Sequence, residues 1–254
     1  LDIDAFFKLM DQPQPSDLSV QLDALEAKSL VIARPNGRYA VTAVGALFLA
    51  RDLVDFPHLQ WRRVRFIKYS ARDRINTVLD KIETSGYALS FERVMDLVQS
   101  HVSVREVIEA GRRESKPRYP PTAVREFLAN ALVHQDLGTS GVQITVEIFE
   151  DRIEIRNPGT PLIDVKRFVD ETRTRNPELA DIMRLAGFCE MRGSGIDRAL
   201  SQIESYFLPA PEFRAESDVT LVTLYGERPF DEMTIDERAW AAFLHSCVRY
   251  VAGE

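Results

Sequence analysis

The segment from Pro121 to His134 constrains the fold most strongly, because its two sides differ in chemistry. A proline suits the start of a helix, where its missing N–H would have no partner in any case. Successive helical residues are about 100° apart, so Leu128 and its apolar neighbours share one side. Glu126, Asn130 and His134 form a polar stripe on the other side. We predict a helix whose stripe is either a solvated face or a set of side chains offered to a ligand.

A hairpin is predicted directly after this helix. Apolar residues recur at every second position, as in strands with one buried face, at Val142, Ile144, Val146, Ile148, Ile153 and Ile155. The turn falls near Asp151, and Asn157-Pro158-Gly159 ends the second strand.

Two more helices and a strand complete this unit. Asn176 is placed to cap a helix that begins at Pro177, and Gly187 is placed to end it. A helix from Gly195 to about Tyr206 and a strand from Asp218 to Tyr225 follow. The order helix, hairpin, helix, helix, strand predicts an α+β fold. We expect a two-layer α/β sandwich with a largely antiparallel sheet and helices on one face.

The preceding residues predict a smaller α/β region. A helix within residues 16–30 comes before Pro35-Asn36-Gly37, and Asn-Gly is a strong hairpin signal. Helix then hairpin resembles the end of a winged helix with Arg34 and Arg38 on its wing, although a plain structural hairpin fits equally well. Further elements are predicted at residues 41–53 (helix), 63–69 (strand) and 90–101 (helix). A polar segment at 112–117 ends in proline, so we divide the chain into residues 1–115, 116–229 and 230–254.

Charge and composition exclude several classes of protein. The net charge of −7 argues against a chain that coats nucleic acid through bulk electrostatics. A local basic cluster is typical of a solvated strand edge or of a phosphate-binding patch, and comprises Arg62, Arg63, Arg65, Lys68, Arg72 and Arg74. No apolar run is long enough to cross a membrane, and the first residues do not resemble a signal peptide. We therefore expect a cytoplasmic protein, and a start at Leu1 suggests a fragment. The two cysteines support neither a zinc site nor a disulfide framework.

Three segments carry side chains suited to binding a phosphorylated ligand. The amide oxygen of Asn130 can ligate Mg²⁺, which needs few protein oxygens when phosphate oxygens are present, and Glu126 can activate a water. Glycines at 193 and 195 open a helix, as in phosphate sites or in a plain tight turn. Asn157 follows an inner strand, where it could meet a purine edge or form an Asx turn.

The order and spacing of these segments resemble the GHKL ATPases. Glu126-x-x-x-Asn130-Ala131 resembles the N box, Asn157-Pro158-Gly159 resembles a modified first glycine box, and Arg192-Gly193-Ser194-Gly195 resembles the glycine box at the end of the lid. Over residues 119–225 the chain is similar, more narrowly, to a family of RecG-like and Schlafen/AlbA-type transcriptional regulators. Residues 43–50 are similar to the segment that joins the AlbA/Schlafen-type domain to this module.

The resemblance implies a nucleotide site for ATP and Mg²⁺. It implies Glu126 as general base, Asn130 as metal ligand and Asn157 near adenine, with further nucleotide contacts from His134, Gly159, Arg175, Arg192, Gly193, Ser194 and Gly195. For His134, the residues alone are equally consistent with capping of helix carbonyls. The chain departs from the GHKL pattern at Asn157, where the family has Asp, and at Pro161, where it has glycine. No Gly-x-x-x-x-Gly-Lys-Ser/Thr loop is present, so helicase motor activity is not expected.

These features predict a regulatory module in which ATP controls a homodimer and its binding to DNA. The resemblance places DNA binding in a winged-helix segment. Residues 233–253 resemble the first helix of that segment. Weak ATPase activity is a further expectation. The alternative is a scaffold that has lost its nucleotide and serves dimerisation or assembly on DNA. A third possibility is that residues 1–115 bind nucleic acid through Arg34, Arg38 and the basic cluster.

Overall fold

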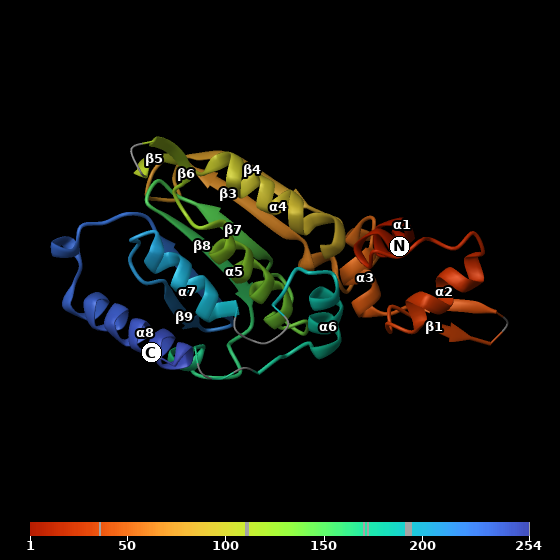
Figure 1. Cartoon of the computed structure of the whole chain (residues 1–254). Helices are drawn as coiled ribbons and strands as arrows, with labels where there is room; N and C mark the ends of the chain where they lie inside the picture. Colours follow the sequence, from red (N-terminus) through yellow and green to blue (C-terminus); the bar gives the residue numbers. More distant parts are fainter. Residues whose placement is uncertain (36, 110–111, 170, 172, 191–194, 254) are drawn as a thin grey trace.

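The computed structural model describes residues 1–254 except 36, 110–111, 170, 172, 191–194 and 254. Its centre is a sheet of six strands in the order β4-β3-β7-β8-β10-β9 (Figure 1). The strands are β3 Val64–Tyr69, β4 Thr77–Glu83, β7 Ile144–Ile148, β8 Arg152–Pro158, β9 Glu212–Glu216 and β10 Val219–Tyr225. Neighbouring strands are antiparallel except for β3 and β7.

Helices cover one face of this sheet. In Figure 1, α4 and α5 lie across it and α7 lies beside α5. The bounds are α4 Tyr87–His101, α5 Pro121–His134, α6 Pro177–Leu185 and α7 Gly195–Ser205, with 3-10 turns at Leu53–Asp55, Gln60–Arg62, Val165–Arg167 and Phe230–Glu232. The predicted α+β sandwich, with a largely antiparallel sheet and helices on one face, is confirmed.

The sheet crosses the boundary predicted near residue 115. Strands β3 and β4 come before that position, and β3 pairs in parallel with β7, for example Phe66 with Val146. Side chains from both halves of the chain therefore enter one core. The polar segment that suggested a boundary forms β6 Arg112–Pro117, which pairs with β5 Val104–Glu109 in a separate hairpin.

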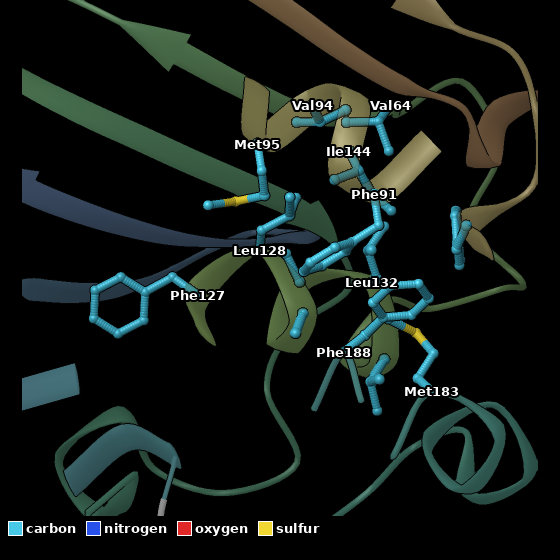
Figure 2. Close-up of a cluster of buried hydrophobic side chains, with 14 of the residues drawn as sticks. Val64, Phe91, Val94, Met95, Phe127, Leu128, Leu132, Ile144, Met183 and Phe188 are labelled. Carbon is cyan, nitrogen blue, oxygen red and sulfur yellow. The ribbon is translucent and has the colours of Figure 1, made fainter. Parts of the chain in front are cut away.

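One hydrophobic core joins α4, α5 and the sheet. Figure 2 shows side chains of α4 and α5 pointing toward one another above the sheet, with Phe188 and Met183 closing the cluster from the α6 side. The rings of Phe91 and Phe188 are stacked with their centroids 4.8 Å apart. Leu128 and Leu132, predicted on the inner side of α5, are each 1% exposed. The core thus holds the apolar side of α5 and leaves its polar stripe facing elsewhere.

The N-terminal elements form a lobe at one end of the molecule (Figure 1). They are α1 Ile3–Leu9, α2 Leu18–Glu26, β1 Val31–Arg34, β2 Arg38–Val41 and α3 Ala43–Leu49. The predicted helix and hairpin are present, and Arg34 and Arg38 are exposed at the tip. Asn36 of the predicted turn lies outside the described residues.

Three arginines of the basic cluster are engaged by partners within the fold. Arg62 is 1% exposed and donates to the backbone carbonyls of Leu137 and Thr139. Arg65 pairs with Asp80 of β4 at 2.5 Å, and Arg74 reaches Glu147 and Glu154 at 2.9 and 2.5 Å. The carboxylates that pair with Arg65 and Arg74 belong to β4, β7 and β8. They come close to these arginines only when the sheet forms.

The last helix, α8 Ile235–Ala252, begins with a capping box between Thr234 and Glu237. It packs on α7 through a small cluster that contains Leu200, Leu244 and Val248. No helix among the described residues is long and apolar enough to span a membrane.

Candidate functional site

The polar stripe of α5 faces a cavity of about 500 Å³. Glu126, Asn130 and His134 all line it, together with Asn157 at the end of β8 and Arg175 before α6. This volume is within the range of sites for small molecules and cofactors. The stripe is therefore not a solvated helix face.

Glu126 and Asn130 interact with each other at the wall of the cavity. The Asn130 amide donates to Glu126 Oε1 at 3.1 Å, which leaves the amide oxygen of Asn130 available to a cation or another donor. Burial raises the pKa of Glu126, and the charge of Glu190 acts in the same direction. A carboxyl group with a raised pKa accepts a proton more readily near neutral pH, as a general base must.

Gly195 brings the start of α7 against Glu126. A Cβ atom at position 195 would overlap the carboxylate of Glu126, so a larger residue would displace that side chain. Gly195 also lines the cavity. The predicted phosphate-loop residues Arg192, Gly193 and Ser194 lie outside the described residues.

His134 is a partly buried imidazole at the same wall. Burial lowers its pKa, and the positive charges of Arg184 and Arg175 lower it further. The ring is therefore neutral at pH 7. Its pKa would rise if an anionic ligand entered between these two cations.

The loop after β8 is packed tightly against the end of α5. Asn157 is 6% exposed, and its amide donates to the Pro158 carbonyl at 3.2 Å, so its own oxygen remains available to accept. Gly159 has φ +98°, and a Cβ there would lie 2.6 Å from the Cβ of Asp136. Gly159 is not among the residues that line the cavity. It shapes the loop that carries Asn157.

Arg175 and Asn176 connect this loop with two helices. Arg175 donates to the Thr160 carbonyl at 2.6 Å and lies 3.6 Å from the carboxylate of Asp136. Asn176 occupies the N-cap position of α6, as predicted, but its side chain makes no capping hydrogen bond. It donates instead to the carbonyls of Val133 and Gln135 at 2.7 and 2.8 Å. These carbonyls end α5 and lack partners within the helix.

Several residues at the cavity had no signal in the sequence. Phe213 of β9, Val222 and Thr220 of β10 and Phe168 give it an apolar side with one hydroxyl. Strand β9 was not predicted, so Phe213 could not be placed. The polar lining also includes Glu171, Arg173, Arg184 and Glu190. Pro161, a departure from the GHKL pattern, also lines the cavity.

Residues 141–224 match the model of a family described as "Putative ATP-dependent DNA helicase recG C-terminal". The predicted family resemblance is confirmed. The matched segment is thus similar to an ATPase-like domain of the RecG type, and it contains Asn157, Arg175 and Gly195. The helix that carries Glu126 and Asn130 lies before it.

The fold is also similar to the crystal structure of the DIP2311 protein from Corynebacterium diphtheriae. The TM-score is 0.71 with 19% sequence identity, over 98% of this chain and 50% of that one. This chain therefore spans half the length of that protein, and the likeness concerns the fold alone. No curated protein matches the sequence.

The donor set of the cavity suits a metal that arrives with its ligand. The described residues contain no group of three or more His, Cys, Asp or Glu side chains that could hold a metal ion. Asn130 and Glu126 offer only two side-chain groups with oxygen donors. Mg²⁺ commonly keeps several waters and takes one or two protein oxygens besides phosphate oxygens, so these residues fit Mg²⁺ bound together with a nucleotide.

Proposed function

We propose that the cavity binds ATP together with Mg²⁺. The observation that carries the proposal is the convergence of Glu126, Asn130, His134 and Asn157 on one cavity of about 500 Å³ beside the ATPase-like segment. The two ends of this cavity differ. Asn157 and Thr220 offer hydrogen-bond acceptors next to the apolar Phe213, which suits a purine. Asn130 offers an oxygen ligand to Mg²⁺ near the start of α7, where backbone N–H groups favour an anion.

Slow hydrolysis is part of the proposal. Glu126 takes a proton from a water that attacks the terminal phosphate, which yields ADP and inorganic phosphate. The raised pKa of Glu126, caused by its burial, supports the role of a base. We further propose that the bound nucleotide controls dimerisation and DNA binding, because the matched family is described as a DNA helicase.

Calorimetric titration with ATP, with and without Mg²⁺, tests binding. We expect Asn130→Ala to weaken ATP binding about tenfold in Mg²⁺ and to have little effect without the metal. Gln99→Ala is the matched control, since it removes an amide from an exposed position of α4. An unsubstituted protein that does not bind ATP, or an Asn130→Ala variant that binds equally well in Mg²⁺, contradicts the proposal.

Hydrolysis is tested separately, by phosphate release under single-turnover conditions. Glu126→Gln should retain ATP binding and lose release of phosphate. Gly195→Ala should have an intermediate effect, because the added methyl group displaces the Glu126 carboxylate, the flexible end of that side chain. Equal turnover in all three proteins would remove Glu126 from the mechanism.

A scaffold without nucleotide is the second candidate. Pro161 and Asn157 favour it, because both depart from the GHKL pattern at the purine side. The size of the cavity favours nucleotide binding instead. A dimer by light scattering that neither binds ATP nor changes with it would support the scaffold.

A further inference from the structure

A buried chain of hydrogen bonds connects the first half of the protein to the end of α5. Tyr87, at the start of α4, is fully buried, and its hydroxyl donates to the backbone carbonyl of Arg62 at 3.0 Å. The same hydroxyl accepts from the side-chain amide of Gln135 at 2.7 Å. Gln135 is also fully buried and donates to the Leu132 carbonyl at 2.7 Å. Burial of polar groups is costly unless they are hydrogen-bonded, and a buried network of such bonds rigidifies the segments that it joins.

Arg62 makes the second connection. Its guanidinium donates to the carbonyls of Leu137 and Thr139, in the segment between α5 and β7. Among the described residues no carboxylate forms a salt bridge with Arg62, and two of its nitrogens, Nε and one Nη, have no hydrogen-bond partner. A buried arginine paired only with backbone carbonyls is an unusual way to stabilise a loop. Tyr87 and Arg62 therefore bond to residues that come before and after Asp136 in the sequence, namely Gln135 on one side and Leu137 and Thr139 on the other.

The segment that contains Gln135 and Asp136 is in direct contact with the loop that carries Asn157. The N–H of Asp136 donates to the Pro158 carbonyl at 2.8 Å, and the Asp136 side chain leaves room only for glycine at position 159. Arg175 connects Asp136 with Thr160, and Asn176 donates to the Gln135 carbonyl. A displacement of Gln135 must move Asp136, and a displacement of Asp136 must move the loop.

We propose that Tyr87 and Arg62 are positioning residues for the purine side of the cavity, acting through Gln135 and Asp136 on Asn157. The inference rests on the proposed function. Both residues lie before residue 115 and outside the segment that matches the RecG-type family, so no motif indicates them. The first half of the chain is thereby part of the binding site's support and sets how well the site recognises a base.

The test uses Tyr87→Phe, which keeps the ring and its packing and removes only the hydroxyl. Tyr39→Phe is the matched control, because it removes a hydroxyl that donates to Asp23 in the N-terminal lobe. In the absence of nucleotide, we expect Tyr87→Phe to accelerate hydrogen exchange at the amides of Asp136 and Gly159 about tenfold. Exchange elsewhere in the sheet should be unchanged. Gln135→Met is a second variant that removes the amide at similar volume and should act in the same way.

Binding supplies the second readout. We expect Tyr87→Phe to weaken ATP about fivefold to tenfold and to leave the affinity for inorganic tripolyphosphate unchanged, so that selectivity for ATP over GTP falls. Equal losses for ATP and tripolyphosphate, or no change in exchange at Asp136 and Gly159, would overturn the inference. If the unsubstituted protein does not bind ATP, the proposed function fails and this inference fails with it. If it binds ATP and Tyr87→Phe binds equally well, this inference alone fails.

Discussion

Two glutamates on opposite sides of the central sheet differ in how their charge is partnered: Glu147 of β7 is buried on the face without helices, and Glu126 of α5 is partly buried on the helix side. On the open face, Glu147 of β7 receives Arg74 at 2.9 and 3.0 Å and the hydroxyl of Tyr69 at 3.0 Å. On the helix side, Glu126 receives the amide of Asn130 as its one hydrogen bond from the described residues. Burial acts to raise the pKa of both carboxyl groups, but the hydrogen bonds and charge of Arg74 bring that of Glu147 below its usual range.

The difference separates scaffold from site. Glu147 and Glu154 stand directly opposite each other on neighbouring strands, an arrangement that is unfavourable for two like charges. Arg74 contacts both of them, and Arg152 adds a contact to Glu154 at 2.6 Å. The charges of this cluster are paired, so they hold the sheet together. The Glu126 carboxylate is partly buried at the wall of a cavity and has no ion pair with any described residue, as expected for a side chain kept for a ligand.

The largest expected effect concerns the apolar layers on the two faces. Phe66 and Ile67 are neighbours on β3, but Phe66 enters the main core and Ile67 the small cluster with Tyr69 and Phe149. We expect Phe66→Ala to lower the free energy of unfolding by about 3–5 kcal/mol. Ile67→Ala should cost roughly 2 kcal/mol, because fewer groups surround it. Urea denaturation measures both, and equal losses would contradict the assignment of the main core to the helix side.

Next in size is the effect of Arg74. Arg74→Met leaves Glu147 and Glu154 opposite each other without their shared partner, and we expect a loss of roughly 2–3 kcal/mol. Arg65→Met is the control from the same basic cluster. Its pair with Asp80 is about two-fifths exposed on both sides, so its loss should cost under about 1 kcal/mol. Similar losses of unfolding free energy in both variants would mean that Arg74 stabilises the sheet no more than an exposed ion pair does.

Glu147→Gln should lower stability at pH 7 by about 1–2 kcal/mol, because hydrogen bonds to a charged group are lost. The pKa of Glu147 is held below its ordinary 4.5, mainly by Arg74 against the opposing effect of burial. Its stabilising contribution is therefore present above pH 4.5 and disappears as pH falls through the lowered pKa. The variant should lose less stability on acidification than the unsubstituted protein. The free energy of unfolding is measured for both proteins between pH 3 and pH 7. If Glu147 played no part, the two plots of this free energy against pH would be parallel.

The smallest expected effect is that of Glu126→Gln, and it is an increase in the free energy of unfolding rather than a loss. Burial raises the pKa of Glu126 above 4.5, so its contribution favours the fold below that pH and is lost as pH rises through the raised pKa. Glu126→Gln keeps the shape without the charge and should increase stability at pH 7 by under about 1 kcal/mol. The gain should vanish in acid. A loss of stability at pH 7 would show that Glu126 supports the fold rather than a site.

The elements with strong local periodicity could be predicted from the sequence. The helix from Pro121 to His134 and the hairpin after it depend on spacings of 3.6 and 2 residues, which short segments reveal by themselves. Strands β4 and β9 escaped prediction. β4 is largely exposed and β9 buries one of its five residues well, so neither has a clear apolar pattern. Edge strands depend on backbone pairing with a neighbour, which a local pattern does not report.

Part of the candidate site could also be predicted from the sequence. The residues Glu126, Asn130, His134, Asn157 and Gly195, singled out from the sequence, all line one cavity, and their role in binding a nucleotide stays a prediction. The sequence did not indicate Phe213, Thr220 or the hydrogen-bond network through Tyr87. Asn176 had the signature of a helix cap, and its side chain bonds to α5 instead. The open carbonyls at the end of α5 became its partners only when the two helices packed together.

The helix from Pro121 to His134 shows which properties the local sequence determines and which depend on tertiary structure. Its periodicity alone determined that an apolar side enters the core and that Glu126, Asn130 and His134 share the other side, because helical geometry is local. Only the folded protein decided that this side faces a cavity rather than water. It also decided which charges in the protein are paired, since Arg74 and Glu147 are 73 residues apart in sequence and meet only when the sheet forms. The energy of a buried charge depends on what surrounds it, and the surroundings come from distant parts of the chain.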